Sequence, residues 1–369
     1  MRFAPKSIAV YSVGLLGGSI GAGLKESGYA GRIIGLSSPK SIEKALAMGC
    51  IDEGHSYDAL KDVVSGVDCL FLCSPILAIM ETIKALGSMN LPEGLIISDV
   101  GSTKKEICAL ARDALPPSVH FIGGHPMAGS EKSGVAASDP FLFQNAVYIL
   151  TPEPHAPDAP ATGFAEFLQR YLGCRSLVLD PAVHDRVVAA VSHVPHILAV
   201  ALVAMAQSVE RTTPGALRLA AGGFRDMTRI ASAPYSLWHD ILLTNKNSIR
   251  PLLEELRGVL AEMESGLMHD ELQTAFDEAA RTRREIPTGT KGFITELNDI
   301  LVKAKDRPGI IADIAGALAA ERINIKDIEV LKVREGEAGT IRLAFESGPI
   351  AQKAVELLSR RGFIARERN

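Results

Sequence analysis

Residues 7–19 read Ser-Ile-Ala-Val-Tyr-Ser-Val-Gly-Leu-Leu-Gly-Gly-Ser, and this stretch decides the fold of the N-terminal part of the chain. Its first half is typical of a short buried strand, and the residues that follow it, 20–25, are apolar and compatible with a helix. Glycines between a strand and a helix let the backbone approach a pyrophosphate, whose charge rests on the free amides of the helix N-terminus. The pattern predicts a dinucleotide site in this turn, formed by Ser12, Gly14, Leu15, Leu16 and Gly17.

The turn departs from the usual Gly-x-Gly-x-x-Gly pattern at its first position, where Ser12 stands. The missing glycine normally makes the tight turn, so we expect serine to be tolerated with a negative φ. A second strand is expected at residues 32–36, and Ser37, Ser38 and Lys40 follow it in place of the acid that binds an adenosine ribose. Without a carboxylate to bond the 2′-hydroxyl or repel a 2′-phosphate, the cofactor is NAD or NADP.

Two more apolar strands end in small polar residues: Ser74 and Pro75 follow the first, and Ser102 follows the second. Ligands in parallel sheets lie outside the carboxyl ends of the strands, so these residues are predicted to face cofactor and substrate. Capping of the next helix is an equally good role for Ser74 and a weaker one for Ser102. Strands at residues 146–150 and 176–179 complete the predicted sheet.

The segment Gly123-Gly124-His125-Pro126-Met127 places a histidine in what we interpret as a turn dense in glycine. An imidazole titrates at about pH 6.5 when unperturbed, so His125 can take a proton as a hydride leaves for a nicotinamide ring. A loop histidine that only caps a helix is the alternative. The dinucleotide pattern upstream favours the catalytic interpretation.

Five segments, spread over nearly the whole chain, resemble the prephenate and arogenate dehydrogenases of tyrosine biosynthesis. They are residues 14–19, residues 99–102, the His125 segment, residues 191–196 and residues 223–231. The resemblance implies an oxidative decarboxylation in which hydride passes to NAD or NADP, a ring hydroxyl loses its proton, carbon dioxide departs and the ring aromatises. It leaves open whether the substrate is prephenate, giving 4-hydroxyphenylpyruvate, or arogenate, giving tyrosine.

The same resemblance assigns roles to four side chains. His125 takes the hydroxyl proton, and Ser102 hydrogen-bonds the same hydroxyl and orients the imidazole. Arg229 matches an arginine that holds a substrate carboxylate, and Glu131 matches an acid proposed to pair with that arginine and gate the pocket. A guanidinium suits bidentate carboxylate binding, which agrees with that role. Arg225, four residues before Arg229, is better interpreted as part of a solvated basic face.

His193 and His196 stand three residues apart and share a face if they are helical. Pro195 predicts that a helix begins there, because proline suits a first turn. No acid or cysteine stands at ligand spacing nearby, so we predict no metal. The resemblance puts His196 on the substrate side, with His193 in support. His184 is predicted to take part in the hydrogen bonding that starts a helix rather than in the site.

Composition excludes other classes of protein. The formal net charge of -4 and the pI near 6.2 give no basic footprint, which argues against a nucleic-acid partner. We interpret no apolar run as long enough to span a membrane, and the first strand begins too early for a signal peptide, so we expect a cytoplasmic protein without a membrane partner. The five cysteines are scattered, which fits reduced and mostly buried thiols.

Two boundaries divide the chain into three predicted domains. Residues 1–179 form a Rossmann-like α/β domain, closed by a βαβ unit after a proline-rich loop. Residues 180–286 form an all-α domain, with helix-compatible stretches at about 184–211, 215–232, 235–265 and 268–284. The resemblance implies that this domain forms the interface of a homodimer and covers the nicotinamide. Trp238 matches a tryptophan near the substrate, with core packing as an equal alternative.

Residues 293–369 form the third predicted domain, after a short polar linker. The expected order of strand, helix, strand, strand, helix, strand is that of an α+β ferredoxin-like unit. Together with the segment from Lys305 to Ile310 it resembles an ACT domain, a small amino-acid sensor that usually works in pairs. An effector such as tyrosine is implied, with its site at Asp306, Gly309, Ile310 and Asn324. A dimerisation module without a ligand is the alternative.

Two rival functions stay open from the residues alone. A dehydrogenase of the β-hydroxyacid type, or an imine reductase, shares the cofactor fold but generally uses a catalytic lysine, for which Lys104 is the candidate near the site. A non-catalytic regulatory protein that responds to amino acids is favoured only by the altered turn at Ser12.

Overall fold

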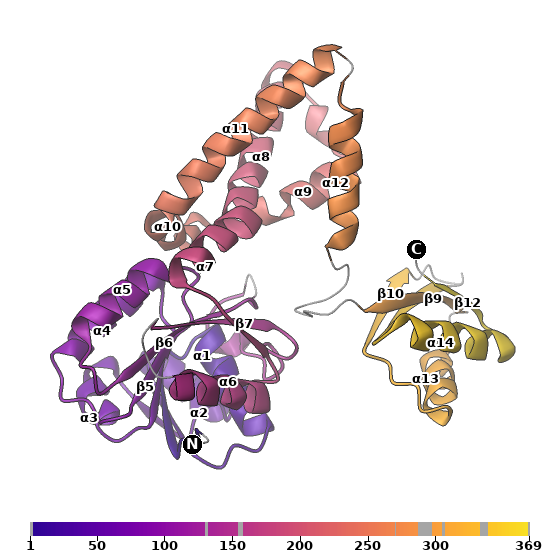
Figure 1. The fold of residues 1–369 in the computed structure, drawn as a ribbon. Coiled ribbons are helices and arrows are strands. Elements are labelled where there is room, and N and C mark those ends of the chain that lie inside the picture. The colour runs from indigo at the N-terminus through magenta and orange to yellow at the C-terminus, as the bar shows by residue number, and fades with distance from the viewer. Residues whose placement is uncertain are drawn as a thin grey trace. The chain divides into compact units, whose positions relative to one another are not determined.

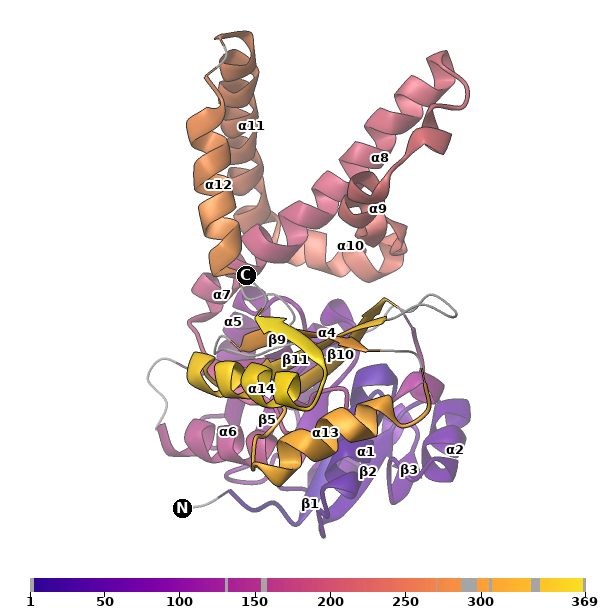
Figure 2. The same ribbon diagram turned by 90° about the vertical axis from the view of Figure 1, so that its right-hand side faces the viewer.

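The computed structural model describes residues 3–129, 132–153, 158–269, 271–286, 297–304, 307–332 and 339–367. It contains two compact units, Met1–Thr274 and Ala275–Asn369. The ribbon is drawn from two directions in Figures 1 and 2.

The first unit is built on an eight-stranded sheet with the order β3-β2-β1-β4-β5-β6-β7-β8. Its strands are β1 (Ser7–Tyr11), β2 (Arg32–Leu36), β3 (Glu53–His55), β4 (Cys69–Leu72), β5 (Ile96–Asp99), β6 (His120–Pro126), β7 (Val147–Pro152) and β8 (Arg175–Val178). The strands from β1 to β6 are parallel, whereas β7 is antiparallel to β6 and parallel to β8. The strand order reverses between β1 and β4, and ligands bind at such a crevice in this class of fold.

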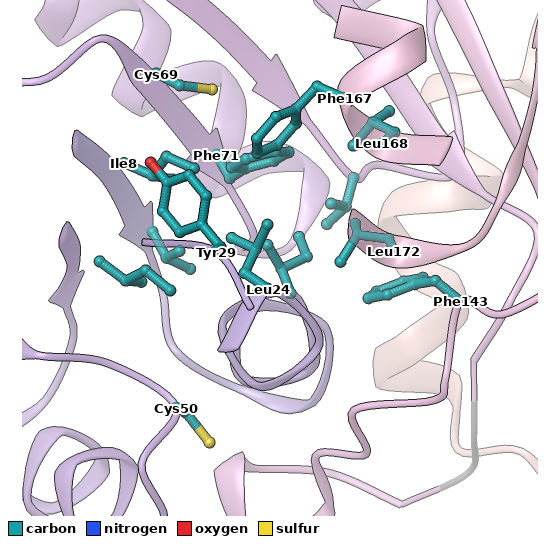
Figure 3. Packing of buried hydrophobic residues seen from close by; sticks show 14 of the residues in the cluster. Ile8, Leu24, Tyr29, Cys50, Cys69, Phe71, Phe143, Phe167, Leu168 and Leu172 are labelled. Atoms are coloured by element: carbon teal, nitrogen blue, oxygen red, sulfur yellow. The ribbon is translucent and has the colours of Figure 1, made fainter. Parts of the chain in front are cut away.

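Helices cover both faces of this sheet and bury a hydrophobic layer on each. They are α1 (Leu15–Glu26), α2 (Pro39–Ala47), α3 (Leu60–Val64), α4 (Ile76–Gly87), α5 (Lys105–Ala114) and α6 (Asp158–Leu172). On one face, Leu24 of α1 and Phe167 and Leu172 of α6 pack with Ile8 and Phe71 of the strands, as Figure 3 shows. Helices α3, α4 and α5 pack on the other face. The predicted Rossmann-like architecture is confirmed.

His125 lies in strand β6 and not in the turn that we predicted. It stands opposite Ile149 of β7. The glycines before it are required by crowding inside the sheet: a Cβ on Gly123 would lie 2.3 Å from Thr151 Oγ1, and one on Gly124 would lie 2.5 Å from the Asp99 carbonyl oxygen. Glycine in a strand often marks such a close approach, which the sequence pattern alone does not separate from a turn.

The middle of the chain is helical. Its elements are α7 (Pro181–Val188), the π-helical segment η3 (Ala189–His193), α8 (Val194–Thr212), η4 (Ala216–Leu219), α9 (Gly222–Thr228), η5 (Arg229–Ser232), α10 (Tyr235–Thr244), α11 (Lys246–His269) and α12 (Gln273–Glu285). The stretch predicted as one helix at 215–232 consists of the short helix α9 with a 3₁₀ turn on each side of it, η4 and η5. The stretch predicted at 235–265 is interrupted at Asn245.

The helix that carries Pro195 begins much earlier than this proline. Asp180 caps it by accepting hydrogen bonds from the amides of Ala182 and Val183, and α7, η3 and α8 then run on without a break. Proline has no amide hydrogen to donate to the carbonyl four residues earlier, and the wider π turn before it absorbs that break. The prediction that a helix begins at Pro195 is therefore wrong.

This continuous helix, Pro181–Thr212, is long and apolar enough to cross a membrane by length and composition alone. The expectation that no apolar run reaches that length is therefore wrong. The helix holds few charged or polar residues, and several of them, His184, Asp185, His193 and His196, are buried in contacts described below, whereas Arg186 is exposed.

The second unit contains a four-stranded antiparallel sheet with the order β10-β11-β9-β12. Its elements are β9 (Asn298–Ala304), α13 (Ile310–Ala320), β10 (Asp327–Lys332), β11 (Gly339–Phe345), α14 (Gly348–Arg360) and β12 (Ile364–Glu367). Both helices pack on one face, where Ile300, Leu318, Leu343 and Leu358 form the core. The predicted ferredoxin-like order is confirmed.

Candidate active site

The glycine-rich turn keeps the geometry of a dinucleotide site without its first glycine. Ser12 has a φ of 72°, so the expectation of a negative φ is wrong. The turn imposes the left-handed conformation, and the serine bears a cost of about 1 kcal/mol. A Cβ on Gly17 would lie 2.6 Å from the Ser12 carbonyl oxygen, so this glycine lets α1 pack on the strand. A Cβ on Gly14 would meet nothing within 4 Å, which leaves the approach to the turn open.

A cavity of about 480 Å³ lies beyond the ends of β1, β4 and β5. It is lined by Leu15 and Leu16 of α1, Ser74 and Pro75 after β4, and Ser102 after β5. Among the residues that the structure describes, no side chain caps the N-terminus of α1, so its first amides are available to an anion. The Ser74 hydroxyl is buried and has no hydrogen-bond partner within the described part of the chain. These features fit a bound dinucleotide.

Ser37 and Ser38 follow β2, as predicted, and a tyrosine that the sequence analysis missed joins them. The Ser37 side chain is buried, and its Oγ lies 3.3 Å from the Tyr57 hydroxyl. The same hydroxyl donates to Ser12 Oγ at 3.5 Å. Ser38 caps α2 through the Ser41 amide. Tyr57 therefore connects the end of β2 with the glycine-rich turn, and no local sequence pattern marks it for that position.

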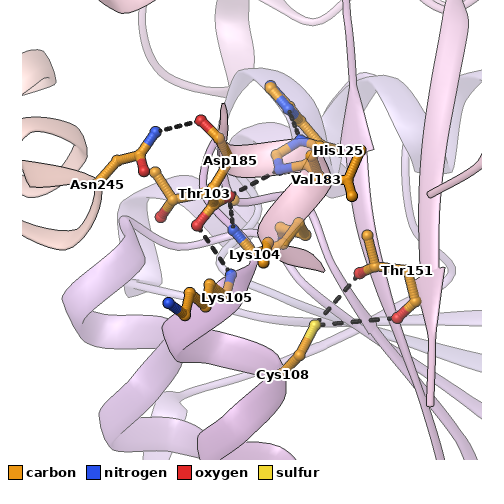
Figure 4. A network of polar contacts seen from close by, with 12 residues as sticks. Thr103, Lys104, Lys105, Cys108, His125, Thr151, Val183, Asp185 and Asn245 are labelled. Atoms are coloured by element: carbon orange, nitrogen blue, oxygen red, sulfur yellow. Dashed lines mark hydrogen bonds and ion pairs between the residues drawn. The ribbon is translucent and has the colours of Figure 1, made fainter. Parts of the chain in front are cut away.

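His125 belongs to a hydrogen-bonded series that Figure 4 shows. Its Nδ1 lies 2.9 Å from His184 Nε2, and His184 Nδ1 lies 2.8 Å from Asp185 Oδ1. His184 and Asp185 are almost completely buried, whereas His125 is half-buried. The prediction that His184 serves the start of its helix is wrong, because Asp180 caps α7 and the His184 ring contacts His125.

The two other histidines join the same region. Asn245 Nδ2 donates to the Asp185 carbonyl oxygen at 2.8 Å and lies 3.1 Å from His193 Nδ1. The His196 ring stacks on Trp238 with 3.7 Å between ring centroids, and His193 meets the same indole edge to face. Both imidazoles are buried. The structure therefore connects His125 of β6 with His193 and Trp238 through residues of α7 and through Asn245, which follows α10.

The predicted carboxylate-binding residue, Arg229, is exposed at the start of η5. Segment η5 packs against α8, the helix that carries His196. Glu131 and Asp306 lie outside the described residues. In the second unit, Gly309 has a φ of 85° and precedes Ile310, the first residue of α13, while Asn324 is exposed in the loop before β10.

Lys104 is fully buried and forms an ion pair with Asp99. Its Nζ also donates to the Gly124 carbonyl oxygen at 2.8 Å, and Asp99 accepts the amides of Gly101 and Gly124. These bonds join the loop that carries Ser102 to the residue before His125. Because its ammonium is committed to these partners, Lys104 does not fit the catalytic lysine of the β-hydroxyacid type.

Three imidazoles of the site, those of His125, His193 and His196, have lowered pKa values that favour the neutral form. Burial lowers the pKa of His125 well below its usual range, and positive charge on Lys104, or on His184 or His193 when either is protonated, lowers it further by repulsion. Burial also lowers the pKa of His193 to about 4, against an opposing effect of Asp185, and it lowers the pKa of His196. A neutral imidazole is the state in which a general base accepts a proton.

Comparison with known proteins agrees with this arrangement. Residues 20–174 match the prephenate dehydrogenase nucleotide-binding domain, residues 180–278 match the prephenate dehydrogenase dimerization domain, and residues 299–354 match the ACT domain. The prephenate dehydrogenase of Bacillus subtilis is 36% identical over 362 residues, which cover 96% of each chain. This chain belongs to the prephenate dehydrogenase family.

Solved structures support the same assignment. Prephenate dehydrogenase from Aquifex aeolicus, in complex with hydroxyphenyl propionate and NAD+, has a TM-score of 0.69 and 32% identity, and covers 78% of this chain and 98% of its own. Synechocystis arogenate dehydrogenase has a TM-score of 0.67 and 28% identity, with 76% and 99% covered. The predicted fold class is confirmed, as is the prediction of a nicotinamide-dependent dehydrogenase, for which these structures support NAD.

The Asp99–Lys104 pair gives a stability prediction. Lys104→Met leaves a buried carboxylate without its cation, so the free energy of unfolding should fall by about 3 to 5 kcal/mol, measured by urea denaturation. Lys84→Met, which loses an exposed pair with Glu81, is the control and should change it by less than about 1 kcal/mol. A Lys104→Met protein as stable as the control would contradict a structural role for this lysine.

Proposed function

We propose that this enzyme catalyses the oxidative decarboxylation of prephenate or arogenate, with hydride transfer to NAD or NADP. The observation that carries the proposal is His125, an imidazole with a lowered pKa, held by a partly buried hydrogen bond near the end of a Rossmann-like sheet, in a chain of this family. Relatives named for either substrate share the fold, so the side chain of the substrate is either a keto acid or an amino acid.

The chemistry divides between the cofactor and this chain. A bound nicotinamide would supply the acceptor for the hydride from the ring carbon that bears the hydroxyl. His125 accepts the hydroxyl proton, and Ser102 hydrogen-bonds the same oxygen and orients the imidazole. Departure of carbon dioxide leaves an aromatic ring whose product keeps a hydroxyl at that carbon, so the His125 imidazolium returns the proton to this oxygen.

Substrate binding falls to the helical part of the site. Arg229 holds a substrate carboxylate through its planar guanidinium, and Glu131 pairs with it and gates the pocket. His196, stacked on Trp238, lies on the substrate side, and His193 supports it through Asn245. Gly14, Leu15, Leu16 and Gly17 would hold the cofactor, with Ser74, Pro75, Ser12, Ser37 and Ser38 beside them.

Three further proposals concern assembly and regulation. The chain forms a homodimer through its helical domain, where exposed apolar side chains include Met205, Leu219, Met227, Leu267 and Met268. It is a cytoplasmic protein in which a second copy, and not lipid, covers the apolar helix Pro181–Thr212.

Tyrosine or another amino acid binds the ACT domain near Asp306, Gly309, Ile310 and Asn324. Sedimentation of the purified chain and tyrosine added to the assay test these proposals.

The central prediction concerns His125. With prephenate and NAD, absorbance of reduced nicotinamide should rise, and kcat/KM should increase with pH as His125 loses its proton. Because its pKa is lowered, the midpoint of that rise should lie below about pH 6.5. His125→Asn should reduce kcat on the order of a hundredfold or more while cofactor binding persists. Near-normal turnover of this variant, with His120→Asn as a control outside the site, would remove His125 from the mechanism.

A second prediction concerns Arg229. If it holds a carboxylate equally in ground and transition states, Arg229→Ala should mainly raise KM, by a loss of about 2 to 4 kcal/mol in substrate binding. Arg218→Ala, an exposed arginine in η4, is the matched control. An unchanged KM with a collapsed kcat would contradict the binding role.

A third prediction concerns cofactor choice. The wild type should use NADP appreciably beside NAD, and Ser37→Asp should shift the preference towards NAD by bonding the ribose diol and repelling a 2′-phosphate. Ser37→Asn has a similar size without the charge and should shift the preference less. Steady-state kcat/KM with both cofactors decides the matter. A strict preference for NAD in the wild type would show that the hydroxyls replace the carboxylate.

A further inference from the structure

The hydrogen bonds behind His125 have a direction that the chemistry of their groups fixes. Asp185 accepts the amide of Lys104 through Oδ1 at 2.7 Å and the amide of Lys105 through Oδ2 at 3.0 Å. A carboxylate that receives amides at both oxygens is stabilised in its ionised form, and an ionised carboxylate only accepts. The bond between Asp185 Oδ1 and His184 Nδ1 therefore requires a hydrogen on His184 Nδ1.

The same logic passes along the series to His125. A neutral imidazole that carries its hydrogen on Nδ1 presents a lone pair at Nε2. In its neutral form, His184 accepts a hydrogen bond at Nε2 from His125 Nδ1, which lies 2.9 Å away. His125 in turn carries its hydrogen on Nδ1 and presents a lone pair at Nε2, the nitrogen that has to accept a proton from substrate.

We propose that His184 and Asp185 are positioning residues for the base: they fix the tautomer of His125 and stabilise the imidazolium that it becomes. This proposal rests on the proposed function for its kinetic consequence but not for its tautomer. The proton taken from substrate binds His125 Nε2. The hydrogen on Nδ1 then shifts toward His184 Nε2, and the positive charge is shared with a ring that is already paired with Asp185. Return of the proton to product reverses these shifts, so nothing is consumed.

Burial makes this arrangement effective. His184 and Asp185 are 0% and 1% exposed, so the carboxylate acts across a medium of low polarity. The nearby ammonium of Lys104 is neutralised by Asp99. Asn245, which lies between α10 and α11, donates to the Asp185 carbonyl oxygen and so holds the backbone of Asp185 in place. Hydrogen-bond partners of metal-binding histidines typically change metal affinity or activity by about 10- to 100-fold when they are removed, and we expect an effect of similar size for the partners of this base.

Two substitutions of His184 separate the two parts of the role. Gln can place an amide oxygen near the position of Nε2, so His184→Gln keeps an acceptor for His125 but cannot share a proton. Phe supplies neither. We expect kcat to fall about 100-fold in His184→Phe and about 10-fold in His184→Gln, with KM and cofactor Kd within about threefold of wild type. The control is His120→Gln, which removes a partly exposed histidine at the end of β6 opposite to His125.

The tautomer is measured without substrate. In the wild type labelled with ¹⁵N-histidine, the ring nitrogens of His125 should show hydrogen on Nδ1 and none on Nε2 at neutral pH. His184→Gln should keep this pattern, and His184→Phe should lose it. Hydrogen on Nε2 of His125 in the folded wild type would overturn the proposal, as would a folded His184→Phe enzyme with kcat within threefold of wild type.

The two hypotheses fail in different ways. If the wild type turns over neither prephenate nor arogenate, the proposed function fails while the ¹⁵N measurement still decides the tautomer. If His184→Phe does not fold, the wild-type tautomer and the His184→Gln kinetics decide the proposal. In that case a wild-type kcat for His184→Gln would exclude proton sharing and overturn the role of His184 in stabilising the imidazolium.

Discussion

The site depends on one carboxylate, Asp185, which receives hydrogen bonds from both sides of the domain junction. Its side chain accepts the first amides of α5, so a residue of the helical part caps a helix of the Rossmann-like part. The N-terminal amides of a helix lack partners within that helix, and their partial positive charge favours an anion. Asp185 thereby fixes α7 against α5, and with it the distance between His184 and strand β6.

The buried ion pair of Asp99 and Lys104 serves position more than stability. Taking two charges out of water costs several kcal/mol, and their attraction with the surrounding hydrogen bonds repays that cost only when the geometry is good. Here the pair also binds the amide and carbonyl of Gly124 and the amide of Gly101. The loop with Ser102 and the strand with His125 are thus held by one ion pair, which fixes the two residues proposed to act on the same hydroxyl.

The sequence predicted what depends on local pattern. Buried strands and the strand-turn-helix at Gly14 could be recognised because apolar runs and glycine spacing are local. The conformation of Ser12 was missed because the turn, and not the residue, sets φ. The strand position of His125 was missed because the crowding at Gly123 and Gly124 comes from β7 and β5, which are distant in the sequence. The contact of His184 with His125 was missed because α7 and β6 are far apart in the sequence and come together only in the folded protein.

The helix Pro181–Thr212 shows why composition alone misleads in this chain. It has the length and apolar character of a membrane span, yet one third of its most apolar window is buried within the protein. His184 and Asp185 near its start, and His193 at the π turn, are buried and hydrogen-bonded. Isolated in lipid, these groups would be costly, whereas each finds a partner here. The exposed apolar surface of α8 is suited to packing against other helices. One continuous helix therefore carries buried polar residues of the candidate site near its start and an apolar contact face in its later turns.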